Sequence, residues 1–225
     1  MSEVQEIAKN CADIHARMKA ALKTQGRAPD SATLVAVSKK QPELRIDAAL
    51  KAGQRVFGEN RVQEAQARWG GRRDSYPDLT LHLIGPLQTN KVKDAVALFD
   101  VFETIDREKL ARKIADEMAA QNMDKPCFIQ VNTGDEAQKA GIHPLAVADF
   151  YDYCRDECGL DIVGLMCIPP FEEPPTPHFM LLRKLAKELG LSQLSMGMSQ
   201  DYESALACGA THIRVGRNFF GERSE

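Results

Sequence analysis

The chain has 225 residues and a formal net charge of −3, with 44% hydrophobic and 27% charged residues, which is typical of a globular protein without a general affinity for nucleic acid or anionic membranes. No apolar run approaches the length of a membrane span, and the opening residues MSEVQEIAKN lack the basic and apolar regions of a signal peptide. We therefore expect one domain over residues 1–225 in the cytoplasm, with reduced cysteines and no cysteine or histidine pattern for a metal.

Apolar residues recur at helical spacing from Val4 to Leu22, which predicts a long amphipathic helix at the start of the chain. After it, apolar strand-like segments alternate with helical ones. The predicted strands are residues 33–38, 55–60, 80–85, 100–105, 127–132, 161–166, 193–198 and 212–217. The helical segments begin near Pro42, Arg61, Thr89, Arg107, Pro144, Pro175 and Gln200.

Strict alternation of strands and helices predicts a parallel sheet. The strand count favours an α/β fold of the (β/α)8 TIM barrel type, with one extra helix at the N-terminus and a short or missing helix after the last strand. The alternative is an open doubly wound sheet. It is less favoured because no G-x-G-x-x-G turn follows the first strand.

The first strand ends in two lysines, in the segment ATLVAVSKKQPEL. Thr33 to Val37 do not alternate in polarity, which is typical of a strand covered on both faces. If Val35 points into the barrel, Lys39 does so as well, and Ser38 and Lys40 point to the helices or to solvent. A lysine that is partly desolvated at the mouth has a lowered pKa and attacks carbonyls. The alternative is an ordinary solvated lysine at a strand end.

Two later strand ends indicate a phosphate site. In SMGMSQDYESAL, Ser199 lies at or near the start of a helix, where backbone N–H groups bind anions, although it could serve only as the N-cap. IRVGRNFFG places Gly216 and the Arg217 backbone at the end of the eighth strand, and TIM barrels commonly bind phosphate after strands seven and eight. Strand eight neighbours strand one on closure. A Schiff-base lysine beside a phosphate site indicates pyridoxal phosphate (PLP).

Arg214 precedes Gly216 by two residues, so both face the same side of the last strand. PLP sites pair the pyridine nitrogen with a carboxylate or an arginine. An arginine stays protonated and can only donate, so it holds the ring nitrogen unprotonated. Such a ring is a weaker electron sink, which suits limited carbanion chemistry or none.

Together these motifs resemble those of the pyridoxal phosphate homeostasis proteins, single-domain relatives of the alanine racemase barrel. The matching segments are AVSKKQP (36–42), FGENRVQE (57–64), HLIGPLQTNK (82–91), VNTGDEAQKAGI (131–142), GLMCIPP (164–170), LSMGMSQDYESA (194–205) and IRVGRNFFGER (213–223). The resemblance implies a barrel that binds PLP as a Schiff base on Lys39. It places Arg214 at the pyridine nitrogen and Asn60 near the ring.

The resemblance also implies that Ser199 and the amides of Gly216 and Arg217 bind the phosphate, and that Lys139 takes part in cofactor transfer. The family commonly has Thr or Ser where this chain has Arg217, so the backbone amide is the contact we expect here. Family members are regarded as cytoplasmic PLP carriers or regulators of vitamin B6 pools. We therefore expect a protein of PLP homeostasis that is not an enzyme. Its expected partners are amino acids, as external aldimines, and PLP-dependent apoenzymes.

Two rival functions remain open at this point. An amino-acid racemase of the alanine racemase type needs a tyrosine opposite the lysine, carried by a second domain that we do not expect in a chain ending at Glu225. The sequence places its tyrosines in a loop, on outer helices or at the start of a helix, and they are Tyr76, Tyr151, Tyr153 and Tyr202. A homodimer could still supply a base across its interface. A barrel aldolase would use Lys39 without a cofactor. His82 either faces the pocket or is a satisfied core histidine, and the second reading is favoured.

Overall fold

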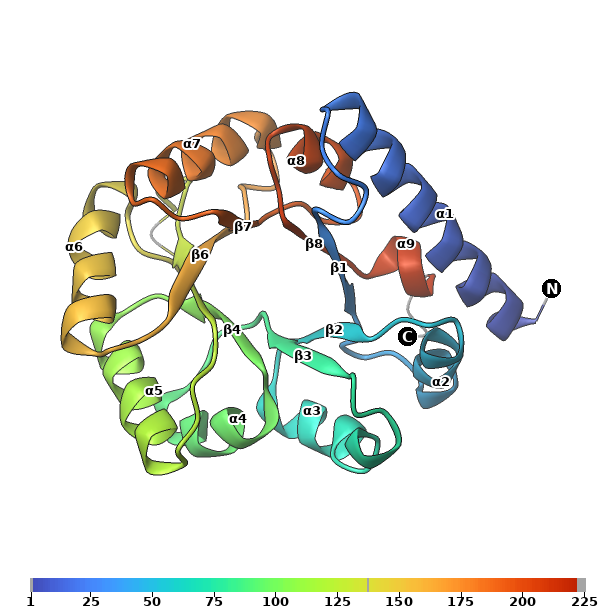
Figure 1. Ribbon diagram of the computed structural model, residues 1–225, viewed down its shortest axis with the longest axis horizontal. Helices are drawn as coiled ribbons and strands as arrows, with labels where there is room; N and C mark the ends of the chain where they lie inside the picture. The colour runs from blue at the N-terminus through green and yellow to red at the C-terminus, as the bar shows by residue number, and fades with distance from the viewer. Residues whose placement is uncertain (1, 137, 222–225) are drawn as a thin grey trace.

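The computed structural model of the chain describes residues 2–136 and 138–221. Its parallel strands close into a barrel in chain order, and the last strand pairs with the first. The strands are β1 Thr33–Val37, β2 Val56–Glu59, β3 Thr80–Leu83, β4 Val101–Ile105, β5 Cys127–Val131, β6 Ile162–Cys167, β7 Gln193–Ser195 and β8 His212–Val215. The helices surround this barrel (Figure 1), which confirms the (β/α)8 fold over the open sheet.

The outer layer follows the predicted order of helices. It consists of α1 Glu3–Thr24, α2 Glu43–Lys51, α3 Val62–Trp69, α4 Val92–Leu98, α5 Glu108–Ala120, α6 Val147–Asp152, α7 Pro175–Glu188, α8 Tyr202–Ala207 and α9 Arg217–Phe220. Single turns add η1 Arg73–Ser75, η2 Thr89–Lys91, η3 Pro144–Ala146 and η4 Tyr153–Glu157. The helix after β8 is short, as predicted. Within residues 2–136 and 138–221, no helix has the length and apolarity needed to cross a membrane.

Helix α1 covers the part of the barrel beside β8, because the helix that follows β8, α9, is too short to cover it. Ser2 and Gln5 form a capping box that fixes its start. The buried residues Ile7, Ile14 and Leu22 lie on one stripe of the helix. This stripe packs against α2, α8 and α9, beside which α1 runs in Figure 1. The extra N-terminal helix therefore closes the helix layer.

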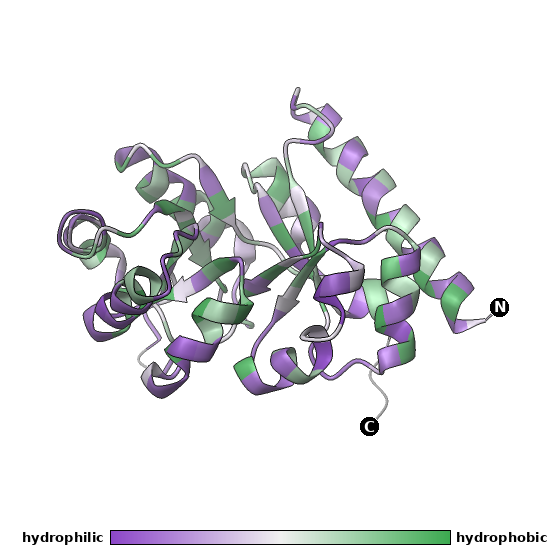
Figure 2. Ribbon diagram, turned by 60° about the horizontal axis from the view of Figure 1, so that its bottom comes forward, coloured by the Kyte–Doolittle hydropathy of each residue, from purple (hydrophilic) through white to green (hydrophobic). Residues whose placement is uncertain are grey.

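The strands are buried on both faces, as their continuous apolar sequences predict. All five residues of β4 and all five of β5 are buried. The outer helices carry hydrophobic and hydrophilic residues together (Figure 2), as expected for amphipathic helices on a core. Inside the barrel, Val101, Phe128 and Met166 form a separate apolar cluster. Buried polar side chains, among them His82, Glu103 and Arg214, share the strands with these apolar residues.

Candidate functional site

The two lysines lie in a turn just beyond the end of β1 and differ in their burial. Ser38 is fully buried, its hydroxyl donates to Glu59 at the end of β2, and its carbonyl accepts from Arg68 of α3. Lys39 is half-buried, and Lys40 is exposed. The Gln41 amide donates to the Ser38 carbonyl at 3.1 Å, which closes a turn around the two lysines. Lys39 therefore lies between the buried strand and the solvent.

A cavity of about 200 Å³ lies at the ends of β1 and β2. Its lining consists of Lys39, Lys40, Asn60, Arg61 and Glu64. The side-chain oxygen of Asn60 is buried and has no hydrogen-bond partner in the described part of the chain. A buried acceptor without a partner is rare in a folded protein and indicates that a ligand supplies the missing donor. Lys39 and Asn60 thus share a candidate ligand site.

The loops after β7 and β8 lie side by side. Asn218 donates from its side chain to the Ser199 carbonyl at 2.7 Å, and its amide is 3.5 Å from the Ser199 hydroxyl. A Cβ added to Gly216 would lie 3.5 Å from the Cβ of Val37. The segment around Ser199 and Gly216 therefore adjoins the end of β1, as the closure of the barrel predicts.

Ser199 is not the N-cap of α8, contrary to one of the two predicted roles. Asp201 occupies that position, and its carboxylate accepts from the Met198 amide at 2.5 Å. Gly197, with φ of 93°, turns the chain before this contact. The helix consequently begins at Tyr202, and Ser199 stays in the loop that faces α9.

Arg214 is buried inside the barrel. Its Nη1 donates to the Ser195 hydroxyl at 2.6 Å, and its Nη2 donates to the Cys167 carbonyl at 2.8 Å. Ser195 and Cys167 are the last residues of β7 and β6. The guanidinium group therefore lies near the mouth end of the barrel, on the strand that leads to Gly216.

A buried carboxylate, that of Glu103 on β4, completes this interior network. It accepts from the Ser195 hydroxyl at 2.6 Å and lies 2.6 Å from Nδ1 of His82. Burial by itself would raise the pKa of Glu103, but the hydrogen bond and charge of His82 and the charge of Arg214 lower it to about 2. His82 is thus a satisfied core histidine, the reading favoured from the sequence.

His212, on β8, lies beside this network. Its ring centroid lies 5.7 Å from that of His82 and 5.3 Å from that of Phe128. Burial lowers the pKa of His212 to about 4, although the charge of Glu103 opposes the shift. At neutral pH this histidine is therefore uncharged inside the barrel.

The described contacts divide the predicted cofactor residues into three groups. Lys39 lines a cavity with Asn60, Ser199 joins the segment that follows Gly216, and Arg214 bonds the ends of β6 and β7. Arg217 begins α9 with an exposed side chain. The three groups lie at or near the C-terminal ends of the strands, where TIM barrels place their sites.

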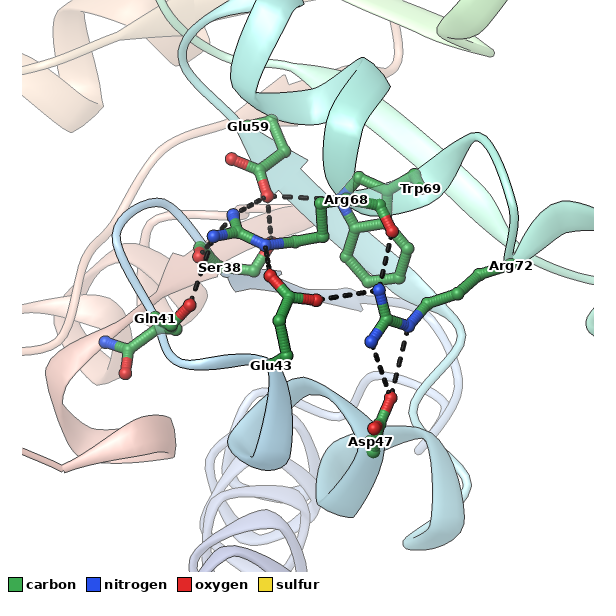
Figure 3. A network of polar contacts seen from close by, with 8 residues as sticks. All are labelled: Ser38, Gln41, Glu43, Asp47, Glu59, Arg68, Trp69 and Arg72. Atoms are coloured by element: carbon green, nitrogen blue, oxygen red, sulfur yellow. Dashed lines mark hydrogen bonds and ion pairs between the residues drawn. The ribbon is translucent and has the colours of Figure 1, made fainter.

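Sequence reasoning missed the buried glutamates that hydrogen-bond to the residues next to Lys39 and Arg214. Glu59 on β2 binds Ser38, Arg68 and Trp69 outside the barrel (Figure 3). Inside, Glu103 does the same for Arg214 through Ser195. The available signal was a glutamate in an otherwise apolar strand, in FGEN and in DVFETI.

Comparison with known proteins identifies the family. The family model described as alanine racemase, N-terminal domain, matches residues 6–224. The pyridoxal phosphate homeostasis protein of Aquifex aeolicus is 38% identical over 216 residues, which cover 92% of this chain and 94% of that protein. The chain belongs to the pyridoxal phosphate homeostasis family. The resemblance seen in its sequence motifs is thereby confirmed.

Solved structures agree with this family membership. PipY of Synechococcus elongatus PCC7942, with PLP bound, is 36% identical and superposes with a TM-score of 0.83 over 96% of this chain and 100% of PipY. The alanine racemase of Bartonella henselae, with covalently bound pyridoxal phosphate, has a TM-score of 0.75 at 12% identity. The matched region covers 99% of this chain and 61% of the racemase chain, and at this identity it shows only that the two share a fold.

Proposed function

We propose that residues 1–225 form one unit that binds PLP at the mouth of the barrel and serves intracellular PLP homeostasis without a turnover reaction. The observation that carries this proposal is the half-buried Lys39 beside the unpaired, buried oxygen of Asn60. The PLP-bound structure of PipY, a relative at 36% identity, supports it. So do relatives that are named for PLP homeostasis.

The residues at the strand ends fit the chemistry of PLP. The amine of Lys39 would bind the aldehyde carbon, and Asn60 would lie near the ring. The Ser199 hydroxyl and the amides of Gly216 and Arg217 would bind the phosphate, since backbone N–H groups and hydroxyls are its usual donors. Gly216 has no side chain to stand between its amide and the phosphate, and it lies next to Val37 at the end of β1.

Arg214 explains why we propose holding rather than turnover. PLP, when bound, supplies an electron sink for reactions at the α-carbon of amino acids. Arg214 only donates, and Ser195 and the Cys167 carbonyl fix its guanidinium near the mouth. A ring nitrogen that faces this group stays unprotonated, which weakens the sink. Amino acids and PLP-dependent apoenzymes are the proposed partners, and the cytoplasm is the proposed location.

The test is the absorbance spectrum of the purified chain with PLP, before and after borohydride, followed by peptide mapping. We expect a visible band that borohydride removes, with the label on Lys39. Lys39→Ala should abolish the band, and Lys40→Ala serves as the matched variant that retains labelling at Lys39. Label on Lys40 in the wild-type chain, or an unchanged spectrum in Lys39→Ala, would contradict the proposal.

A further inference from the structure

A turn of four residues, Ser38–Gln41, carries Lys39 at the end of β1. It is closed by the hydrogen bond from the Gln41 amide to the Ser38 carbonyl. Its third residue, Lys40, has φ of 58°, in the left-handed region that disfavours residues with a Cβ. The local sequence does not favour this turn, so the position of Lys39 depends on contacts from elsewhere in the chain.

Arg68 on α3 supplies two of these contacts from outside the barrel (Figure 3). Its Nη1 donates to the Ser38 carbonyl at 2.9 Å, and its Nη2 donates to the Gln41 carbonyl at 3.1 Å. One planar guanidinium therefore binds both ends of the turn. A lysine in this place would keep the charge but lose the fixed fork of donors.

Glu59, the last residue of β2, holds Arg68 in place. One oxygen of its carboxylate accepts from Arg68 Nη1 at 2.7 Å, from the Ser38 hydroxyl at 2.7 Å and from Trp69 Nε1 at 3.1 Å. The other oxygen is buried without a hydrogen-bond partner among the residues described. A buried carboxylate needs its donors, so these three contacts fix Glu59. Glu59 in turn holds Arg68, whose Nε also donates to Glu43 at 3.3 Å.

The outward contacts determine the positions of two inward residues. Ser38 and Glu59 immediately precede Lys39 and Asn60, which line the cavity. We propose that Glu59 and Arg68 are positioning residues that hold Lys39 and Asn60, from outside the barrel, in the geometry that PLP binding requires. This inference rests on the proposed function of the site.

The first test compares Arg68→Lys with Arg72→Lys. Arg72 belongs to the same network, where it binds Asp47, Glu43 and the Arg68 carbonyl. Arg68→Lys removes one charge-assisted bond to the turn and should lower PLP affinity by about tenfold. It should also move a measurable share of borohydride-trapped PLP from Lys39 to Lys40. Arg72→Lys should keep the label on Lys39.

Loss of general stability would lower the melting temperature but leave the ratio of label on Lys39 and Lys40 unchanged. Arg68→Lys with wild-type affinity and label on Lys39 alone would overturn the proposal. Glu59→Gln is a second variant, since its amide oxygen still accepts from Ser38 and Trp69 but loses the charge opposite Arg68. We expect Glu59→Gln also to lower PLP affinity and to move label from Lys39 to Lys40. Wild-type affinity with a wild-type ratio of label on the two lysines would contradict the inference.

A double variant tests the strained turn directly. Glycine adopts positive φ without the penalty that lysine carries, so Lys40→Gly should make the turn less dependent on Arg68. When Lys40→Gly is added to Arg68→Lys, PLP affinity should rise by about threefold over that of Arg68→Lys alone. The Lys40→Gly single variant is the reference for any effect of the glycine itself. No recovery would mean that Arg68 does not act through the turn.

A measurement without cofactor separates this inference from the proposed function. Hydrogen exchange of the peptide over residues 36–44 should accelerate by roughly tenfold at the Gln41 amide in Arg68→Lys, and should stay unchanged in Arg72→Lys. If the wild-type chain fails to bind PLP on Lys39, the proposed function is wrong, but the exchange rates still decide whether Arg68 holds the turn. Unchanged exchange in Arg68→Lys would overturn the positioning role.

Discussion

The direction of each hydrogen bond inside the barrel is determined by the chemistry of its partners. Arg214 can only donate, so the Ser195 oxygen accepts from it and uses its own hydrogen for the Glu103 carboxylate. An ionised Glu103 accepts this bond, in agreement with its pKa of about 2. This chain of donors fixes the orientation of the guanidinium that we place beside the ring nitrogen of PLP.

At the same scale, we expect Ser199→Ala to weaken PLP binding much more than it weakens the fold. A hydrogen bond to a charged phosphate contributes about 1.5–3 kcal/mol, which corresponds to roughly tenfold or more in affinity. The Ser199 hydroxyl has a long contact of 3.5 Å with the Asn218 amide, so the free energy of unfolding should change by less than about 0.5 kcal/mol.

Absorbance titration with PLP and urea unfolding measure these two effects for Ser199→Ala. Ser204→Ala, at an exposed position of α8, is the matched control and should behave as wild type in both. Wild-type affinity in Ser199→Ala would place the phosphate elsewhere.

His212 should make the fold sensitive to mild acid. Its folded pKa of about 4 lies below the ordinary value of 6.5, so the unfolded chain takes up a proton first as the pH falls. Stability is therefore complete above pH 6.5 and declines toward pH 4, by about 2–3 kcal/mol at pH 4.5. The lowered pKa of Glu103 acts only below its ordinary value of 4.5, so the window from pH 7 to 4.5 isolates His212.

The measurement is the free energy of unfolding in urea at several pH values in this window, for the wild type and His212→Gln. The glutamine does not titrate, so the decline with falling pH should shrink by about 2–3 kcal/mol. His143→Gln, at a half-exposed surface histidine, should keep the wild-type slope. An equal slope in His212→Gln would show that another group causes the decline.

At the scale of elements, the cavity depends on how closely the loop after β3 approaches the end of β2. A Cβ on Gly85 would lie 2.5 Å from the carbonyl oxygen of Asn60 and 2.6 Å from its Cα. The Thr104 hydroxyl also donates to the Gly85 carbonyl at 3.0 Å, which holds the loop against β4. The loop cannot retreat without losing this bond, so Asn60 depends on the absence of a side chain at position 85.

We therefore expect Gly85→Ala to displace Asn60, to lower the free energy of unfolding by about 1–3 kcal/mol and to reduce PLP affinity. Gly71→Ala is the control, because a Cβ on Gly71 would meet open space. Urea unfolding and absorbance titration measure both effects. Unchanged affinity in a destabilised Gly85→Ala chain would separate Asn60 from the cofactor site.

At the scale of the whole molecule, the tyrosines of the described chain lie away from Lys39. Tyr76 lies in the connection before β3, at the end of the barrel opposite the mouth, and Tyr151 and Tyr153 lie in the outer layer on α6 and η4. Tyr202 is buried in α8, with Arg17 of α1 over its ring at 5.6 Å. In the described chain, none of them lies in a loop at the C-terminal ends of the strands beside Lys39.

We expect that amino acids bound with PLP exchange their α-proton slowly and from one face, with retained configuration. A positioned acid or base contributes about 10²- to 10⁴-fold in rate, and Lys39 can serve one face only. Incubation with L-alanine in heavy water, followed by chiral analysis, measures both properties, and Lys39→Ala gives the background. Rapid, saturable interconversion of L- and D-alanine would instead establish a racemase.

The sequence by itself determined the barrel, because continuous apolar strands alternating with amphipathic helices have few other ways to bury both strand faces. Strand alternation also distinguished Lys39 from Ser38, since it depends only on local backbone geometry. Gly216 and Ser199 were placed near Lys39 by the same reasoning, because closure makes β8 the neighbour of β1. Ser199 lies close to the start of α8, as predicted, but it is not the N-cap, because the chain enters the helix only at Asp201.

Only the tertiary structure decided which buried polar groups pair. Ser195 and Glu103 are 92 residues apart in sequence, yet they meet across the barrel. Ser38 and Glu59 lie on neighbouring strands, and Arg68 reaches both from a helix. Periodicity indicates which way a side chain faces, but its partner depends on strand register, the tilt of the strands and the rotamers in the packed core. The hydrogen bonds that position Lys39 and Arg214 could therefore be identified only in the folded chain.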